Sequence, residues 1–204
     1  YNGVTAVYIG FLPGSKVTAP KPYTYTTPFA LYGSSITQGG CATRPGNMYP
    51  AYLSRWLDAD YINLGFSGSA RGEEVMARHI AGLKISAFIY DYDHNAPNPD
   101  HLEKTHEAFF KIIREQQPEL PVIFVSKPDF DYNLPDSRRR RDIILRTYKN
   151  ALDAGDKNVR FVDGETLFGK KDRGACTVDR VHPNDLGFYR MAKGIYPALK
   201  EILE

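Results

Sequence analysis

The sequence contains few of the residues that indicate special environments. Its 204 residues include two cysteines, one tryptophan and three methionines. Cys41 and Cys176 are too few for the disulfide framework of a small secreted domain, and no CxxC pair indicates a zinc or redox motif. A bond between them would close a loop of about 135 residues and stabilise the fold by about 4–5 kcal/mol. The sequence leaves the free and the bonded states open.

An excess of charge of one sign is also absent, because 26 basic residues stand against 24 acidic ones. This balance argues against nucleic acid or an anionic membrane surface as a partner. No apolar run approaches the roughly 18 residues of a membrane span, and no signal peptide is visible. The chain opens on Tyr1, which fits a processed product or a fragment. Secreted, periplasmic and cytoplasmic locations and the oligomeric state all stay open, with a secreted or periplasmic location favoured over a cytoplasmic one.

The composition is that of a globular domain, with 42% hydrophobic and 25% charged residues. Five short apolar runs, rich in β-branched and aromatic residues, alternate with amphipathic stretches. The strand candidates are 29–32, 61–64, 87–90, 121–125 and 159–162, and the helix candidates are 47–58, 72–83, 100–116, 137–154 and 184–203. This alternation predicts a three-layer α/β/α sandwich around a five-stranded parallel sheet. Pro197 is expected to bend or break the last helix near its end.

The pattern divides the chain into residues 28–204, which carry the α/β repeat, and residues 1–27, which do not. Alternating apolar residues from Val4 to Ile9 predict a short strand, and several prolines and threonines follow it. Two interpretations of 1–27 remain open. The segment is either an extended lead-in left from a preceding β-domain or a strap over the surface of the α/β domain.

In a parallel sheet, ligands bind outside the carboxyl ends of the strands, so the loops that follow the strands carry most information. A Gly-flanked serine pair, Ser34 and Ser35, follows the first strand, and Gly65 follows the second. The sequence Asp-Tyr-Asp-His-Asn at 91–95 follows the third strand. Each segment alone is common turn chemistry.

A histidine and an aspartate precede the last predicted helix. Asp179 and His182 are three residues apart, and Pro183 ends the loop that holds them. At this spacing the carboxylate can hold the imidazole in one tautomer, as a base requires. With the serine pair and the glycine-rich loop, the set supplies a nucleophile, a base and amide donors. This combination predicts acyl transfer.

In their order along the chain and in their residues, these segments resemble the SGNH hydrolases, also called the GDSL esterase/lipase family, over about residues 28–200. Gly-Ser-Ser-Ile-Thr at 33–37 is similar to the Gly-Asp-Ser block of that family, which makes Ser35 the implied nucleophile. Gly65 matches the second-block glycine and Asn95 the third-block asparagine. The longer strings around 32–42 and 63–68 resemble a branch with a β-sandwich domain before the hydrolase domain.

The resemblance implies a flavodoxin-like hydrolase fold, a catalytic triad and no cofactor. Ser35, Asp179 and His182 would form the triad, with no metal ion. The oxyanion hole would consist of the Ser35 and Gly65 backbone amides and the Asn95 side chain. The implied activity is hydrolysis of an ester with a small acyl group, and the resemblance alone suggests acetyl on a carbohydrate.

Three positions depart from the family pattern. Ser34 replaces the first-block aspartate, which we expect to have little catalytic effect because the nucleophile follows it. Asp93 stands where a glycine is usual, and Ala96 where an aspartate is frequent, and both substitutions point to an altered substrate pocket. The candidate substrate-binding residues are therefore Arg44, Arg71, Asp93 and His94.

Other side chains have simpler interpretations. Arg138 to Arg141 form a basic run that we interpret as the solvated face of a helix; alternatively, Arg138 or Arg139 overhangs the site. Three tyrosines flank strand ends and are expected in the core or at its rim, namely Tyr32, Tyr90 and Tyr92.

Three other functions are compatible with parts of the sequence. Acyl transfer to a second alcohol would use the same residues as hydrolysis. A metal-dependent phosphoesterase would bind its ion through Asp91, Asp93, His94, Asp179 and His182. A binding module that has lost catalysis is the third alternative.

Overall fold

The computed structural model describes residues 5–204 and contains one parallel five-stranded sheet with strand order β2-β1-β3-β4-β5. The strands are β1 (Tyr25–Gly33), β2 (Ala59–Gly65), β3 (Phe88–Asp91), β4 (Val122–Val125) and β5 (Val159–Val162). In register, Gly33 pairs with Gly65 on one side and with Asp91 on the other. The three loops that follow β1, β2 and β3 therefore start side by side at one edge of the sheet.

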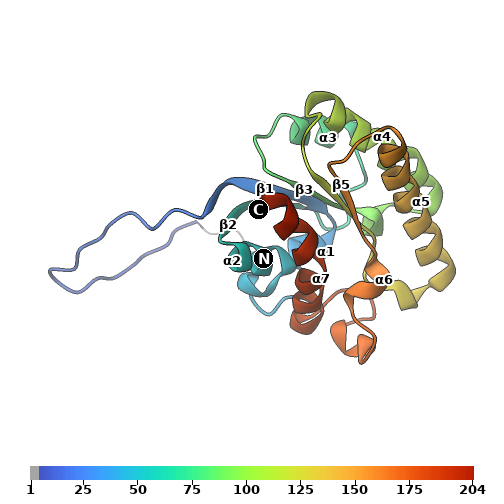
Figure 1. Cartoon of the computed structure of the whole chain (residues 1–204). Coiled ribbons are helices and arrows are strands. Elements are labelled where there is room, and N and C mark those ends of the chain that lie inside the picture. The colour runs from blue at the N-terminus through green and yellow to red at the C-terminus, as the bar shows by residue number, and fades with distance from the viewer. Residues whose placement is uncertain (1–4) are drawn as a thin grey trace.

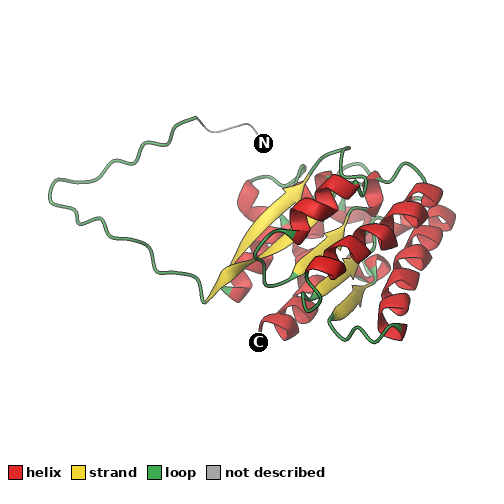
Figure 2. Cartoon of the chain, turned by 90° about the horizontal axis from the view of Figure 1, so that it is seen from above, coloured by secondary structure: helices red, strands yellow, loops and turns green. Residues whose placement is uncertain are grey.

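Helices cover both faces of the sheet, as predicted (Figures 1 and 2). The long helices α2 (Tyr49–Leu57) and α7 (Asp185–Leu203) pack on one face, and α3 (Glu74–Ala81), α4 (Pro99–Gln116) and α5 (Leu134–Asp153) pack on the other. The shorter helical segments are α1 (Ser35–Gln38), α6 (Gly164–Leu167), η1 (Pro45–Asn47), η2 (Asp93–Asn95), η3 (Phe130–Tyr132) and η4 (Arg173–Cys176).

The sheet separates two hydrophobic cores because side chains alternate along each strand. In β1, Phe29 and Leu31 enter the core under α2 and α7, whereas Ala30 and Tyr32 enter the core under α3, α4 and α5. Both sets are fully buried. Central strands of this kind read as continuous apolar runs, which is why the sequence revealed them.

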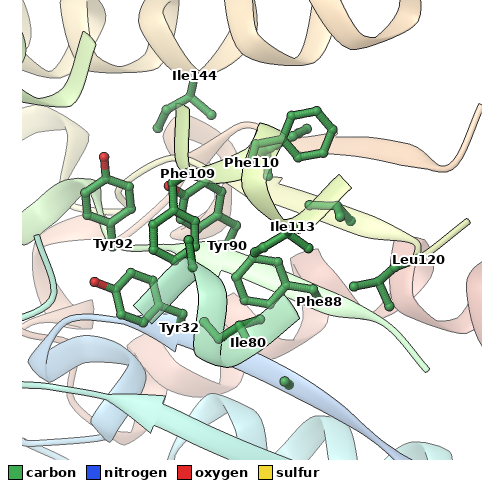
Figure 3. Packing of buried hydrophobic residues seen from close by; sticks show 14 of the residues in the cluster. Tyr32, Ile80, Phe88, Tyr90, Tyr92, Phe109, Phe110, Ile113, Leu120 and Ile144 are labelled. Atoms are coloured by element: carbon green, nitrogen blue, oxygen red, sulfur yellow. The ribbon is translucent and has the colours of Figure 1, made fainter. Parts of the chain in front are cut away.

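Aromatic rings fill the core under α3, α4 and α5 (Figure 3). Phe109 of α4 stacks on Tyr32 and Tyr90, with ring centroids 5.0 and 4.8 Å apart. Tyr90 also stacks on Tyr92 and on His106. The expectation that the three tyrosines belong to the core is confirmed. Burial lowers the pKa of His106 to about 3, so this histidine is neutral in the folded protein.

Two prolines lie inside regular elements. Pro28 lies within β1, where the register with β2 shifts between Tyr25 and Phe29, as expected where a strand residue lacks an N–H. Pro197 lies within α7, and the helix continues to Leu203. Of the two expected outcomes, a bend or a break, the structure excludes the break. Ile195 and Leu199, on either side of Pro197, are fully buried, so packing holds this end of the helix against the sheet.

Residues 5–24 form an extended arm that projects away from the α/β body (Figures 1 and 2). The structure has no strand over 5–9, and the start of the predicted strand at Val4 lies outside the described residues. Residues 5–24 are almost entirely exposed, with Tyr8 at 93% and Leu12 at 82%. Over residues 5–204, no helix has the length and apolar character that a membrane crossing requires.

Candidate active site

Ser35 begins helix α1 directly after the central strand β1. The hydroxyl of Ser34 caps this helix by accepting a hydrogen bond from the Ile36 N–H at 3.1 Å. Ser34 therefore has a structural contact of its own where the family pattern has aspartate. The Ser35 amide is at the start of the helix, where N–H groups have no partner within the helix and favour negative charge.

Glycines let α1 lie tightly against the strand ends. A Cβ added to Gly33 would stand 2.0 Å from Thr37 Oγ1, and one added to Gly65 would stand 2.2 Å from the Gln38 nitrogen. Both distances are far below van der Waals contact. Only glycine at these two positions leaves room for the turn that carries Ser35.

The loop before α7 holds Asp179 and His182 in a compact arrangement. Asp179 Oδ1 accepts hydrogen bonds from the Val181 and His182 backbone amides at 3.0 and 2.7 Å. Arg180, between them, has φ 73°, in the left-handed region that non-glycine residues rarely adopt. Partial burial raises the pKa of Asp179, but hydrogen bonds from the His182 ring and these amides outweigh it and lower the pKa to about 2.

A continuous series of hydrogen bonds links Ser35 to these two residues. Asp179 Oδ2 lies 2.7 Å from His182 Nδ1, and His182 Nε2 lies 3.0 Å from Ser35 Oγ. Ser35 and His182 are 147 residues apart in the sequence. An ionised carboxylate, an imidazole and a hydroxyl in this order can transfer the hydroxyl proton to the imidazole.

Two of the predicted oxyanion donors already make hydrogen bonds in this structure. The Gly65 N–H donates to Asn63 Oδ1 at 2.9 Å, and the Asn95 side-chain amide donates to the Phe66 carbonyl at 2.9 Å. Asn95 keeps a second N–H because a carboxamide carries two. Asn63 also donates to the Thr37 carbonyl at 2.9 Å, so it joins β2 to α1. Sequence reasoning missed Asn63, although it lies on the strand that leads to Gly65.

The two arginines predicted to bind substrate are exposed and lie in different loops. Arg44 precedes η1, and its positive charge is one of the influences that lower the pKa of Asp185 at the start of α7; hydrogen bonds from Thr43 contribute most. Arg71 lies after β2, where its Nε donates to the Gly68 carbonyl at 3.3 Å. Neither guanidinium is hydrogen-bonded to Ser35, His182 or Asp179.

The structure corrects the prediction for Asp93. Its side chain is only 1% exposed, and its Oδ2 accepts a hydrogen bond from the Lys127 backbone amide, which speaks against contact with substrate. Burial raises the pKa of this carboxyl. His94 keeps some exposure and lies 2.8 Å from Asp129 Oδ1 through its Nε2. Asp93 therefore has a structural role beneath the site.

The residues proposed as metal ligands do not converge. Asp91 accepts hydrogen bonds from Tyr49 and Thr37, while His94 pairs with Asp129 and Asp179 with His182. Among residues 5–204, no group of three or more His, Cys, Asp or Glu side chains is placed to hold a metal ion. The five candidate residues therefore form no shared ligand set in this geometry, because Asp91, Asp93 and Asp179 each bind a different protein partner.

A buried group of charged side chains lies beside this site, and sequence reasoning missed it. It comprises Lys127 and Asp129 after β4 and Arg140 on α5, with Asp136 at its margin. Arg140 belongs to the run that was interpreted as a solvated face. Helical spacing places Arg140 with Ile144, Thr147 and Ala151, all buried, and this periodicity was the available signal.

Neither cysteine forms a disulfide, Cys176 being buried and Cys41 half-buried.

Comparison with known proteins places this geometry in a family. The model of the GDSL-like lipase/acylhydrolase family matches residues 26–200. A GDSL-like lipase candidate from Bacteroides ovatus has 34% sequence identity and a TM-score of 0.80, and the match covers 90% of this chain and 55% of that protein. No curated protein matched the sequence.

Two further solved structures share the fold at lower identity. The salicylyl-acyltransferase SsfX3 of a tetracycline biosynthetic pathway has 21% identity and a TM-score of 0.75 over 88% of this chain and 56% of that one. A family two carbohydrate esterase from Clostridium thermocellum, solved with cellohexaose, has 17% identity and a TM-score of 0.70 over 92% of this chain and 67% of that one. The chain thus spans little more than half the length of the first two proteins. It belongs to the GDSL-like lipase/acylhydrolase family.

Proposed function

We propose that this protein is a serine esterase that removes a small acyl group, such as acetyl, from a carbohydrate. The observation that carries the proposal is the hydrogen-bonded series from Asp179 through His182 to Ser35. The carbohydrate part draws on two relatives of similar fold. One was solved with cellohexaose, and another is a two-domain esterase active on acetylated mannans.

In the proposed mechanism, His182 Nε2 takes the proton of Ser35 as its Oγ attacks the ester carbonyl carbon. The tetrahedral oxyanion accepts hydrogen bonds from the Ser35 amide and from the second N–H of Asn95. The Gly65 N–H also donates to the oxyanion. It does so either by leaving the Asn63 oxygen or by donating to both oxygens at once. His182 then gives its proton to the departing alcohol oxygen, and the acyl group stays on Ser35.

Deacylation repeats the sequence with water. His182 takes a proton from a water molecule whose oxygen attacks the acyl-enzyme, and the Ser35 oxygen leaves with a proton from His182. The products are a carboxylic acid and free Ser35. Asp179 has a pKa of about 2, so it is ionised at neutral pH and stabilises the imidazolium at each step. An alcohol in place of water would make the same site an acyltransferase.

The test is hydrolysis of p-nitrophenyl acetate and of an acetylated mannan oligosaccharide, with and without EDTA. We expect Ser35→Ala to lower kcat by about 10³-fold or more on both substrates, and EDTA to change nothing. Ser86→Ala is the matched control, because this serine precedes β3 at the other end of the sheet and its hydroxyl has no hydrogen-bond partner among residues 5–204. Wild-type activity in Ser35→Ala would refute the nucleophile assignment.

Product analysis separates hydrolysis from transfer. With an acetylated sugar as donor and glycerol as an added acceptor, we expect free acetate to exceed acetylated glycerol. A predominance of acetylated glycerol would replace the hydrolase proposal with the acyltransferase one. If the protein hydrolyses p-nitrophenyl acetate but not the sugar ester, the serine esterase assignment stands and the proposed carbohydrate substrate is refuted.

We also propose that the arm over 5–24 packs against a β-domain in the full-length protein. Its support is the exposure of apolar side chains such as Tyr8, Ile9 and Leu12, which isolated domains rarely leave in water. Hydrogen exchange on the full-length protein would show protected amides over 5–24, and rapid exchange there would refute the proposal.

A further inference from the structure

The turn that carries Asn95 is bracketed by one arginine side chain. Helix η2 spans Asp93–Asn95. Arg140 Nη1 donates to the Asp93 carbonyl at 2.5 Å and to the Ala96 carbonyl at 3.0 Å. These two carbonyls lie on either side of His94 and Asn95. A single nitrogen on α5 therefore holds both ends of the segment that presents the Asn95 side chain.

The guanidinium is itself held in place. Asp136, one helical turn earlier on α5, accepts a hydrogen bond from Arg140 Nε at 2.7 Å. The Arg140 side chain is only 8% exposed. A buried guanidinium is stable only where its donors and its charge are satisfied, so the Asp136 carboxylate and the two carbonyls account for its position. Arg140 cannot move without leaving buried groups unpaired.

This arrangement requires the shape of an arginine side chain. The planar guanidinium directs its N–H groups along fixed directions, so Nε can face Asp136 while Nη1 faces the two carbonyls. Lysine keeps the charge but offers one ammonium group on a flexible stem. An Arg140→Lys variant is therefore expected to keep the buried charge and lose the simultaneous contacts with both ends of η2.

We propose that Arg140 is a positioning residue for catalysis, which acts by fixing the η2 turn so that the free N–H of Asn95 points at the oxyanion. This inference rests on the proposed function, because it requires Asn95 to be an oxyanion donor. Donors of this kind contribute only when they stand within hydrogen-bond distance of the developing charge. A loosened η2 turn would thus lower kcat and leave substrate binding nearly unchanged.

The test is a double-mutant cycle on Arg140 and Asn95 with p-nitrophenyl acetate. We expect Asn95→Ala to lower kcat by about 10²–10³-fold, as for the loss of one oxyanion donor. Arg140→Lys should lower kcat by about 10–100-fold, with KM within about twofold. In the Asn95→Ala background, Arg140→Lys should cost less than about threefold, because two changes that act through one group are not additive.

The matched control is Arg146→Lys, the same substitution on the same helix at an exposed residue paired with Glu103. It should leave kcat within twofold. Asp136→Asn is the second variant, for the case that Arg140→Lys does not fold. It keeps Arg140 but removes its carboxylate partner, so it should lower kcat by about 3–10-fold with the same non-additivity toward Asn95→Ala.

The pH profile of kcat/KM separates positioning from general damage, since a loosened η2 turn changes none of the groups that donate or accept a proton in the proposed mechanism. The profile of the variant should keep the wild-type shape at a lower height. Equal losses in both Asn95 backgrounds, a shifted profile, or a folded Arg140→Lys enzyme with wild-type kcat would each overturn the proposal. If Asn95→Ala itself is harmless while Ser35→Ala is inactive, the oxyanion assignment fails and the nucleophile stands.

Discussion

Gly65 lies directly against the backbone of Gln38. A Cβ added to Gly65 would stand 2.2 Å from the Gln38 amide nitrogen. The end of β2 thus touches the backbone of the short helix that begins with Ser35. Any side chain at 65 must displace this helix, and with it the serine hydroxyl that lies 3.0 Å from His182 Nε2.

We predict that Gly65→Ala lowers kcat by at least about 10-fold and destabilises the fold by about 1–3 kcal/mol, the usual cost of overpacking. Kinetics and urea unfolding measure the two effects. Gly174→Ala is the control, because no atom of the described part of the chain lies within 4 Å of its added Cβ. Unchanged kinetics in Gly65→Ala would mean that the contact with Gln38 does not constrain the site.

The carboxylate of Asp179 is expected to matter through the histidine it holds. Asp179→Asn can present either its oxygen or its NH₂ to His182 Nδ1, so the ring loses its single tautomer. We predict a fall in kcat of about 10³–10⁴-fold and a lower melting temperature at neutral pH, because an amide oxygen accepts the two backbone hydrogen bonds more weakly than a carboxylate does. A fall of less than tenfold would show that His182 is oriented by other contacts.

The acidity of Asp179 has its own test. Its pKa of about 2 lies below the usual value for aspartate, so the folded state favours the ionised form. The stabilisation that it contributes is present above the unfolded pKa and is lost as the pH falls through about 2. We predict that the carboxyl carbon resonance of Asp179 does not titrate down to about pH 3. A midpoint near 4 would contradict the hydrogen bonds described.

His106 should make the protein less stable in acid. Its folded pKa of about 3 lies below the unfolded value of about 6.5, so the unfolded chain binds more protons between these values. Stability is therefore fully present above about pH 6.5 and falls as the pH drops toward 3, by up to about 1.4 kcal/mol per pH unit.

The matched variant is His106→Phe, which keeps a ring to stack on Tyr90. We predict that the unfolding free energy of the wild type falls relative to that of His106→Phe between pH 6.5 and pH 4.5, as measured by urea unfolding. Parallel curves for the two proteins would show that His106 is protonated in the folded state.

Asp91 is expected to favour its neutral form more strongly than an exposed aspartate does. Burial, reinforced by the nearby charge of Asp93, raises its pKa well above the usual range. Its Oδ2 accepts hydrogen bonds from the Tyr49 hydroxyl at 2.9 Å and from Thr37 at 3.2 Å, and an asparagine oxygen can accept the same two.

We therefore predict that Asp91→Asn changes kcat by less than about threefold and stability by less than about 1 kcal/mol, while Asp91→Ala removes the acceptor that the Tyr49 and Thr37 hydroxyls share and costs about 1–3 kcal/mol. Steady-state kinetics and urea unfolding measure these effects. A large loss of activity in Asp91→Asn that a divalent cation restores would revive the metal hypothesis.

The α/β repeat was predictable because buried parallel strands and amphipathic helices each leave a local pattern. The strand candidates agree with the observed strands, although β1 begins at Tyr25 and β2 at Ala59, earlier than the apolar runs themselves. Hydrogen bonding extends these strands beyond the apolar runs. The start of α5 at Leu134, three residues before its predicted start, depends on the Asn133 side-chain cap.

Local patterns alone predict the order of strands and helices and the loops in which polar residues follow them, because these depend on neighbours in the chain. Tertiary structure decided how those residues are used. Asp93 is buried against the Lys127 amide, Asn63 donates to the Thr37 carbonyl, and Arg140 reaches two carbonyls more than 40 residues away. Each outcome depends on which strands are neighbours in the sheet, and strand order is a property of the packed molecule.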